Sequence, residues 1–376
     1  MYRVLVIGNA NSIWLKEYVK KIHIAKGAEV YLTAYNPINE RFLKEYNKLG
    51  VNIVPLYSQN KLVDKISKAF NIFCFIRKNG KFLNCVDIQS PPHNNQAIFL
   101  SHILKGVKAK KSITFWGSDL MRINVSEARI LSKILVLADK INISTEEMVS
   151  VFKSHYGNTF DSKLVSAKFG SLAFDAIDKI RDSLTKQECK AQFGLNSEKI
   201  TVAVGHNGNK EQQHIKVLKE LAYLDFDIKN KIELVFHVGY GLKDNYADEI
   251  AEEAKKTGIS YVIIKDMLDL DDIAKLRNAT DIIIHAQTTD ALSGSIRECI
   301  YAGTVLINPT WINYEEFDNI GIQYFKYSEF SEINSMVSKL ISGDICVDIH
   351  NNIKLMKIFS WESVSRDWES IFQRGL

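Results

Sequence analysis

The chain has 376 residues, of which 46% are hydrophobic and 24% are charged, and its formal net charge is +4 at neutral pH. These values are typical of a soluble globular protein, and they exclude a disordered or fibrous chain. The length suits two domains of about 150 to 200 residues each. The charge is too small and too dispersed for a nucleic-acid-binding surface, so no nucleic acid partner is expected.

The sequence predicts a cytoplasmic protein. No apolar run reaches the roughly 18 to 20 residues that span a bilayer, and the opening MYRVLVIGNA reads as a strand and a turn rather than as a signal peptide. The cysteines have no C-x-x-C spacing, which argues against a disulfide framework and a zinc site. We expect all five to be buried small apolar residues: Cys74, Cys85, Cys189, Cys299 and Cys346.

Four lysines crowd into the stretch LKGVKAKKSI, at Lys105, Lys108, Lys110 and Lys111. Such a cluster is typical of a solvated loop or helix end. Alternatively, it contacts anionic lipid headgroups, where each basic residue contributes on the order of 1 kcal/mol. The second interpretation would place the protein peripherally on the inner face of the plasma membrane.

Short apolar runs rich in β-branched residues alternate with helix-like segments in the first half of the chain. The predicted strands are YRVLVIG, AEVYLTAY, VNIVPLY, FLNCVDIQ, KSITFWG and DKINIST, and SIWLKEYVKKIHIAK (12–26) is a predicted helix. This alternation is typical of βα units around a parallel sheet buried on both faces. The first half is therefore expected to be a Rossmann-like domain.

A second series of βα units follows a helical connecting region at residues 169–200. Its predicted strands are ITVAVGHNG, IELVFHVGYG, ISYVIIKDML, ATDIIIHAQ, GTVLINP and IQYFKY, separated by helices such as NYADEIAEEAKKTG, which ends at Gly258. We therefore predict an α/β fold with two Rossmann-like domains facing a cleft, at 1–172 and 173–358. A final helix at 359–376, with Phe359, Trp361, Val364, Trp368 and Phe372 on one face, is expected to pack back on the first domain.

Ligands of open parallel sheets bind beyond the carboxyl ends of the strands, so the residues that follow each strand are the candidates. After ITVAV, a turn with Gly205, Asn207, Gly208 and Asn209 leads through Lys210 into a helix, whose N-terminus would favour a phosphate. The alternative is an ordinary turn.

Two further strand ends in the second half carry polar groups. After YVII, backbone groups of Asp266 and Met267 could border a base, whereas Asp269 or Asp271 is expected to cap the next helix. After DIIIHAQ, we expect residues 293–295 (Ser293, Gly294, Ser295) at a helix N-terminus suited to a diphosphate, with Glu298 one turn further on. A carboxylate there can accept hydrogen bonds from two adjacent ribose hydroxyls, and the alternative is a surface glutamate.

Polar residues also follow the strands of the first half. These are Gly8, Asn11 and Ser12 after the first strand, His93 in SPPHNN, and Trp116, Asp119 and Arg122 in FWGSDLMR. Histidines and aspartates transfer protons when burial tunes them, so His93 and Asp119 are the acid/base or acceptor-orienting candidates. A lone histidine at a strand end is otherwise structural.

Asp290 and Glu298 are separated by seven residues, and together with YAGTVLINP they resemble the E-x7-E element of the family 4 retaining glycosyltransferases, with Asp in place of the first Glu. FWGSDL and GHNGNKEQQHIKVLKEL resemble the bacterial 4-acetamido-4,6-dideoxygalactose transferases of surface polysaccharide (O-antigen and capsule) assembly. The first family retains the anomeric centre and the second inverts it. Both resemblances imply the GT-B fold, with the nucleotide-sugar on the C-terminal domain.

The resemblance implies a set of roles. The donor site would comprise Gly8, Asn207, Lys210, Asp266, Met267, Ser293, Gly294, Ser295, Arg297 and Glu298, with Glu298 on the ribose. Asp290 and His93 would face the transferred sugar, and Asn11, Ser12, Trp116 and Arg122 would bind the acceptor. Family 4 usually has an arginine before its lysine in the phosphate region, and GHNGNK has none, so Lys210 acts alone or with Arg297.

The implied reaction transfers a sugar from a nucleotide diphosphate sugar to a saccharide or lipid-linked saccharide in bacterial surface polysaccharide synthesis. Helix amides and Lys210 would stabilise the leaving diphosphate, so neither a metal nor a cofactor is expected. No D-x-D triplet occurs at a suitable place, and DLDD (269–272) is better explained as a helix cap. The alternatives are a GT-B sugar-nucleotide 2-epimerase and a non-catalytic nucleotide-binding subunit.

Overall fold

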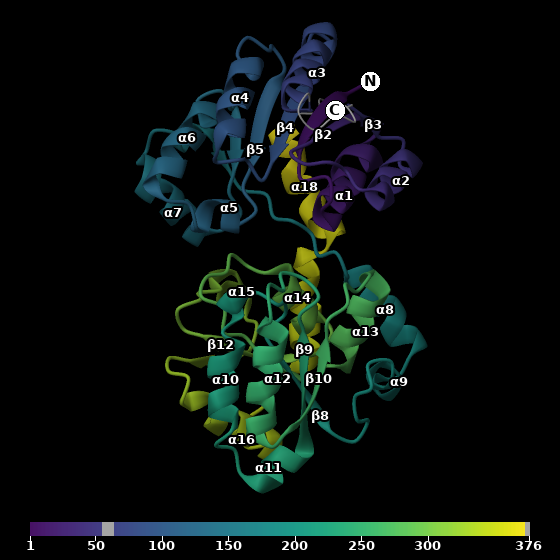
Figure 1. Cartoon of the computed structure of the whole chain (residues 1–376), viewed down its shortest axis with the longest axis vertical. Helices are drawn as coiled ribbons and strands as arrows, with labels where there is room; N and C mark the ends of the chain where they lie inside the picture. The colour runs from purple at the N-terminus through teal and green to yellow at the C-terminus, as the bar shows by residue number, and fades with distance from the viewer. Residues whose placement is uncertain (55–63, 373–376) are drawn as a thin grey trace. The chain divides into compact units, whose positions relative to one another are not determined.

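The computed structural model describes the backbone of residues 1–54 and 64–372, and the side chains of all of these except 64–71. The chain forms two compact units (Figure 1). The first unit comprises Met1–Gly170 and Trp361–Leu376, and the second comprises Ser171–Ser360. The domain boundaries expected from the sequence, after residues 172 and 358, each lie two residues from these.

The first unit contains a parallel sheet of seven described strands in the order β3-β2-β1-β4-β5-β6-β7. The strands are β1 (Arg3–Gly8), β2 (Glu29–Ala34), β3 (Asn52–Ile53), β4 (Cys85–Gln89), β5 (Lys110–Thr114), β6 (Lys140–Asn142) and β7 (Leu164–Val165). Five of them lie in the predicted runs and β5 begins one residue before its run, although the end of VNIVPLY falls outside the described residues. The two-residue β7 was not predicted because so short a pairing leaves no periodic pattern.

Helices connect these strands. They are α1 (Ile13–Tyr18), α2 (Glu40–Lys48), α3 (Asp64–Asn79), α4 (Asn95–Leu104), α5 (Ser118–Met121), α6 (Val125–Leu135), α7 (Glu146–Tyr156) and α18 (Trp361–Phe372). The predicted helix at 12–26 begins as α1 but continues as a π-helical turn (Val19–His23) and a 3-10 turn (Ile24–Lys26), which ends at Gly27 in the left-handed region.

Alternating side chains bury the first sheet on both faces. Val4 and Val6 of β1 belong to a core that also contains Tyr18 of α1 and Trp368 of α18. Leu5 and its neighbour two residues on point to the opposite face and are equally buried. The C-terminal helix α18 is thus an integral part of the first unit, although it follows the whole second unit in the sequence.

The second unit contains a parallel sheet of six described strands in the order β10-β9-β8-β11-β12-β13. The strands are β8 (Ile200–Val204), β9 (Ile232–His237), β10 (Ser260–Ile264), β11 (Ile282–Ile284), β12 (Val305–Pro309) and β13 (Phe325–Tyr327). The helices are α8 (Phe174–Ser183), α9 (Lys186–Ala191), α10 (His214–Leu221), α11 (Phe226–Lys231), α12 (Tyr246–Thr257), α13 (Leu270–Ala279), α14 (Gly294–Tyr301), α15 (Glu315–Ile320), α16 (Glu332–Ser342) and α17 (Ile349–Met356).

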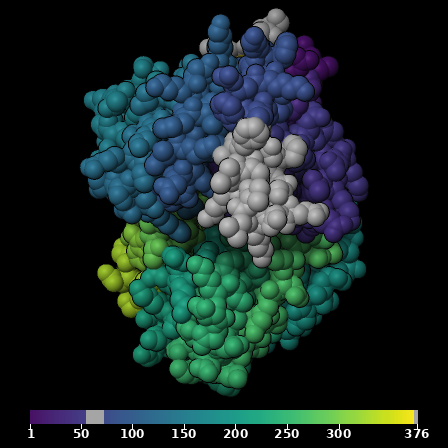
Figure 2. Space-filling model, turned by 45° about the horizontal axis from the view of Figure 1, so that its top comes forward, coloured from purple at the N-terminus to yellow at the C-terminus, as the bar shows by residue number. Residues whose placement is uncertain are grey.

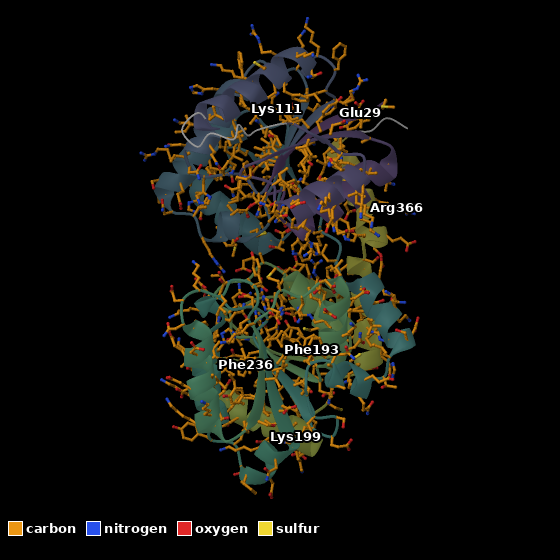
Figure 3. All side chains as sticks on the ribbon, turned by 45° about the vertical axis from the view of Figure 1, so that its right-hand side comes forward. Glu29, Lys111, Phe193, Lys199, Phe236 and Arg366 are labelled. Carbon is orange, nitrogen blue, oxygen red and sulfur yellow. The ribbon has the colours of Figure 1, made fainter. Side chains whose placement is uncertain are left out.

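The second sheet separates two cores, one on each face. Ala203 and Ile283 pack into the core that contains α8, α13 and α14. Their sequence neighbours Val204 and Ile284 pack into the other core, against α10, α12 and α16. Phe193 and Phe236, labelled in Figure 3, belong to the first and second of these cores respectively. This two-sided burial explains why the strands are continuous apolar runs.

Two expectations about individual residues change with the structure. Cys85, Cys189 and Cys299 are buried, but Cys74 near the end of α3 and Cys346 before α17 are exposed, so their predicted burial was wrong. Ile72 and Ile76 supply the buried face of α3 beside Cys74, whereas Cys346 lies between Ile345 and Val347, which are only partly buried.

Among the described residues, no helix is long and apolar enough to cross a membrane.

Candidate active site

Each sheet has one point where the order of its strands reverses. The order places β1 beside β4 in the first unit, and β8 beside β11 in the second, so that the following connections leave in opposite directions. A crevice forms at the carboxyl ends of such a pair, and ligands of doubly wound sheets bind there. The residues after β8 and β11, and after β1 and β4, therefore define the candidate sites of the two units.

Backbone strain gathers at these strand ends. Four described non-glycine residues have a positive φ, and three of them, Ser90, Gln213 and Leu292, lie in the segments that follow β4, β8 and β11. Leu292 has φ 62° although its side chain is buried. Strained conformations of this kind persist where the surrounding structure enforces them, and they cluster at functional sites.

Asp290 is held in the loop between β11 and α14. Its carboxylate accepts hydrogen bonds from the hydroxyl of Tyr314 and from the backbone N–H groups of Ala291 (2.9 Å) and Ser293 (3.2 Å). The Tyr314 ring stacks parallel to the ring of His285, and Asn308 Oδ1 lies 2.9 Å from His285 Nδ1. The carboxylate that the sequence singled out is therefore fixed in one orientation.

Ser293 is the N-cap residue of α14, and Gly294 and Ser295 form its first turn, as the sequence predicts. All three residues are partly exposed, whereas Arg297 and Glu298 on the same helix are buried. The first turn of a helix presents N–H groups without helical partners and a favourable dipole to an anion. This turn is accessible to a ligand in the described structure.

Glu298 is buried rather than openly accessible. Its side chain is 5% exposed, its Oε2 lies 3.7 Å from Nε of Arg277, and its Oε1 accepts a hydrogen bond from Ser171 Oγ at 3.4 Å. Burial raises the pKa of the Glu298 carboxyl, while Arg277 and Arg297 oppose that shift. Glu298 is thus a member of a buried ion cluster, and a ribose that binds it would reach it at the margin of that cluster.

Arg297 is the second cation of this cluster. Burial lowers its pKa to about 10, and the charges of Glu298 and Asp290 oppose the shift. Its guanidinium carbon lies 5.3 Å from the ring centre of Phe359. Arg277 and Arg297 together offer two buried positive charges near the N-terminus of α14, where a diphosphate would need them.

The turn after β8 approaches the loop after β11. Gly205 has φ 66°, and a Cβ there would lie 2.8 Å from both Gln212 Oε1 and His214 Nε2, so a glycine is required. Gln212 is fully buried and donates from Nε2 to Oε1 of Gln287 in the β11 loop. This bond joins the two strand ends at the point where the strand order reverses.

The helix expected directly after Lys210 begins later than predicted. It begins a 3-10 turn, Lys210–Gln212, and α10 starts only at His214, because Gln213 adopts the left-handed region and separates the two. The Lys210 ammonium lies 3.2 Å from Glu249 Oε1 of α12 and is largely exposed. Asn207 is buried and accepts a hydrogen bond from the Asn209 N–H at 2.9 Å.

Asp266 and Met267 follow β10 and are exposed, Met267 to 69%. Their backbone rests against Gly239 after β9, where a Cβ would come within 2.0 Å of Asp266 O. Asp269 accepts a hydrogen bond from the Asp272 N–H at 2.9 Å and caps α13, which confirms the predicted cap. The groups expected to border a base are therefore accessible and backed by a glycine.

In the first unit, Gly8 ends β1 and a Cβ there would come within 3.2 Å of Gln89 O. Ser12 is the N-cap residue of α1. Asn11 has a structural role in the described state, because Nδ2 donates to Pro37 O at 2.7 Å and Oδ1 accepts from the Asn39 N–H at 2.8 Å. Arg122 follows α5 and is exposed.

Asp119 and His93 have contrasting environments. Asp119 is 7% exposed and accepts hydrogen bonds from the N–H groups of Trp116 and Gly117, and burial raises its pKa to about 6 against the opposing effect of these bonds. His93 is 38% exposed in its side chain, and Nε2 lies 3.3 Å from Glu127 Oε1. Of the two, Asp119 has the environment of a tuned acid or base.

A chain of buried hydrogen bonds holds the Trp116 side chain in place. Trp116 Nε1 donates to Gln89 Oε1 at 3.0 Å, and Gln89 Nε2 donates to Asp87 Oδ1 at 2.8 Å. Asp87 also accepts from Tyr18 and Ser112, and His23 Nε2 lies 3.0 Å from it. The predicted acceptor-binding indole is thereby anchored to the centre of the sheet.

The structure brings together Asp290, Ser293, Gly294, Ser295, Arg297 and Glu298, all within one loop and one helix. Sequence reasoning missed Arg277, His285 and Tyr314, which reach this cluster from α13, the end of β11 and the segment after β12. Arg277 carried no signal because it lies in an ordinary helix. His285 directly follows an apolar run, and that position could have marked it. Among the described side chains, no group of three or more potential metal ligands occurs.

No protein-family model matches the sequence, and no curated protein is significantly similar to it. Solved structures are similar in fold. A glycosyltransferase from Rickettsia africae matches 100% of this chain and 99% of its own, with a TM-score of 0.76 and 16% identity. Anabaena HepE, solved in complex with UDP and glucose, matches with a TM-score of 0.70 and 11% identity over 97% of this chain and 98% of its own.

A third similar structure is the lipopolysaccharide outer core galactosyltransferase WaaB in its apo form, with a TM-score of 0.67 and 8% identity over the whole of both chains. Two of the three are glycosyltransferases by description, HepE holds UDP and glucose, and the likeness spans both units. The chain therefore has the GT-B fold, with a Rossmann-like parallel sheet in each unit, as the sequence predicted.

Proposed function

We propose that the chain is a glycosyltransferase that moves a sugar from a nucleoside diphosphate sugar to a hydroxyl group of a saccharide acceptor. The observation that carries the proposal is the cluster of Asp290, Arg297 and Glu298 around the exposed first turn of α14. It lies where the strand order of a GT-B sheet reverses. HepE, a protein of the same fold, was solved with UDP-glucose, so a UDP-sugar is the first donor to test.

The second unit would supply most of the donor site. The diphosphate would lie on the N–H groups of Gly294 and Ser295, with the Ser293 and Ser295 hydroxyls and Arg297 nearby. Glu298 would accept hydrogen bonds from the ribose, and the backbone at Asp266 and Met267 would border the base. Asn207 and Lys210 would complete the phosphate side, provided that Lys210 exchanges its Glu249 contact for the ligand.

The main barrier of the reaction is the negative charge that develops on the departing nucleoside diphosphate. Fixed N–H groups and buried cations stabilise such charge without reorganising, and each such donor contributes about 3 kcal/mol in comparable sites. Here the helix turn of α14 together with Arg277 and Arg297 would supply this stabilisation, and we propose that no metal is needed. Asp290, fixed by Tyr314, would face the transferred sugar.

The first unit would bind the acceptor. Trp116 offers an indole anchored through Gln89, Asp119 is a carboxylate tuned toward neutrality, and Arg122 is exposed. Ser12 and His93 belong to the same group of strand-end residues, and Gly8 shapes the end of β1. We propose a saccharide acceptor, attached to a lipid, in bacterial surface polysaccharide synthesis at the cytoplasmic side of the membrane. Transfer with retention and transfer with inversion both fit these residues.

The test measures turnover of UDP-glucose, UDP-galactose and UDP-N-acetylhexosamines by the purified chain, with and without a mixture of lipid-linked saccharides. The release of UDP reports turnover. Acceptor-dependent release that is lost in Asp290→Asn would support the proposal. Release or epimerisation with the donor alone would indicate the 2-epimerase instead. Tight nucleotide binding without any turnover would indicate a non-catalytic subunit.

A further inference from the structure

The amino-terminal edge of the first sheet carries exposed aromatic side chains. Phe73 of α3 is 42% exposed, and Phe82, in the turn between α3 and β4, is 61% exposed. Single exposed apolar side chains are common on protein surfaces, and these two are distinguished by the cations near them. This edge lies at the opposite ends of the strands from the candidate site of the same unit.

Positive charge surrounds the two rings. Segments 73–84 and 102–112 contain no acidic residue. Their exposed cations are Arg77, Lys78, Lys81, Lys105, Lys108 and Lys110. Lys111, the fourth lysine of the cluster seen in the sequence, is partly buried instead, because Nζ donates to Val107 O and Ala109 O.

The two segments are neighbours in space. Lys110 N–H donates to Asn84 O at 3.1 Å, and β4 and β5 pair from Cys85 and Lys110 onward. Figure 3 labels Glu29 and Lys111, at the starts of β2 and β5 on this edge, and Figure 2 shows the blue surface of this part of the first unit from outside. Helix α3, which carries Phe73 and Arg77, packs beside α4, which ends at Leu104 just before Lys105. We name the exposed side chains of segments 73–84 and 102–112 together the basic-aromatic edge.

Arginines near the two rings favour insertion of the rings into a bilayer boundary over stacking of the rings on nucleic acid bases. The guanidinium of Arg77 lies 5.4 Å from the centre of the Phe73 ring, and that of Arg3 lies 5.9 Å from the centre of the Phe82 ring. One face of each ring is thus covered by a cation, which disfavours stacking of a nucleic acid base on it. Ring edges flanked by Lys and Arg are typical of side chains at the boundary between headgroups and acyl chains.

We propose that the basic-aromatic edge docks the protein on an anionic lipid bilayer, with Phe73 and Phe82 entering the headgroup boundary and the surrounding cations contacting the headgroups. Binding to such a surface increases with the apolar area that enters the headgroup boundary and with the electrostatic attraction to anionic lipids, and the rings and the cations supply one contribution each. The proposal does not depend on the catalytic assignment, because it concerns the opposite edge of the sheet.

The test is sedimentation of the full chain with vesicles of phosphatidylglycerol and phosphatidylcholine, compared with vesicles of phosphatidylcholine alone. We expect binding to the anionic vesicles that weakens as salt is added. Lys78→Glu with Lys81→Glu should weaken binding by at least about 25-fold, at about fivefold per lysine lost. Phe73→Ser with Phe82→Ser should abolish the binding that persists at high salt.

The matched control is Lys255→Glu with Lys256→Glu, an exposed pair at the end of α12 in the second unit that gives the same change of charge. This control should bind vesicles like the wild-type chain, and nucleotide binding should be unchanged in all three variants. Equal loss in the control, absence of binding to anionic vesicles, or binding to duplex RNA but not to vesicles would each overturn the proposal.

Discussion

Asp119 shows how one buried carboxyl couples acidity to stability. Its pKa is raised from 3.8 to about 6 by burial, so the folded state holds the proton at pH values where the unfolded chain has released it. The contribution of Asp119 to the free energy of unfolding therefore falls as pH rises from about 4 to 6 and is constant above that range. At neutral pH the ionised Asp119 therefore lowers the free energy of unfolding. Its raised pKa also lies near the range that suits a general base.

We predict that Asp119→Asn removes this pH dependence. Wild type should lose about 2 to 3 kcal/mol relative to the variant between pH 4 and pH 7. Urea unfolding followed by tryptophan fluorescence measures the difference, because Trp14, Trp116, Trp361 and Trp368 lie in the first unit. A difference between the two proteins that is the same at both pH values would show that the Asp119 pKa is not raised.

Gln89 acts through Trp116 as a positioning residue. In Gln89→Leu the indole N–H loses its acceptor and Asp87 loses one of its donors, so unfolding should become about 1 to 3 kcal/mol easier. If the indole contacts the acceptor, KM for the acceptor should rise while KM for the donor stays constant. A change in stability with both constants unaltered would assign the chain of hydrogen bonds to folding alone.

At the scale of elements, the close approach of the strand ends depends on glycines. In Gly239→Ala the new methyl would lie 2.0 Å from Asp266 O, so the backbone at Asp266 and Met267 must move. We predict a loss of about 1 to 3 kcal/mol in stability and weaker nucleotide binding. Gly258→Ala meets no neighbour within 4 Å and has only the strain of φ 72°, so it should leave binding unchanged. Equal binding by both variants would remove this strand end from the donor site.

The elements were largely predictable, and the contacts between them were not. Continuous apolar runs such as ITVAV and DIIIHA announce strands buried on both faces, and Gly258 and Asp269 mark helix ends by their own chemistry. Local pattern did not reveal that Gln213 interrupts the helix after β8, since its left-handed conformation is imposed by the surrounding fold.

In the candidate site, too, neighbours in the sequence were predictable and tertiary partners were not. Asp290, Ser293 and Arg297 lie in one contiguous stretch, so their proximity could be predicted. Arg277 meets Glu298 from another helix, and Tyr314 meets Asp290 across 24 residues of chain. Such partners are defined by tertiary packing, and one sequence carries no signal of it. Their presence turned a glutamate expected to be open into one that is buried and paired.

At the scale of the whole molecule, each unit has its own core, so each should unfold as its own cooperative transition. We predict that UDP stabilises the transition of the second unit, by about 2.7 kcal/mol at a concentration 100 times its Kd. Scanning calorimetry with and without UDP measures this, with the first unit as the internal control. A nucleotide effect confined to the transition of the first unit would contradict a donor site in the second unit.

The most direct test of the donor site is titration calorimetry of UDP, GDP, dTDP, CMP and their sugars into wild type, Glu298→Gln and Asp281→Asn. Asp281 is the matched control, because it also pairs with a buried cation, Lys190, but lies at the amino end of β11. We predict that one nucleoside diphosphate binds wild type and Asp281→Asn alike, and that Glu298→Gln loses about 1.5 to 3 kcal/mol of binding. A loss below about 0.5 kcal/mol, or no binding of any nucleotide by wild type, would contradict the donor site proposed around α14.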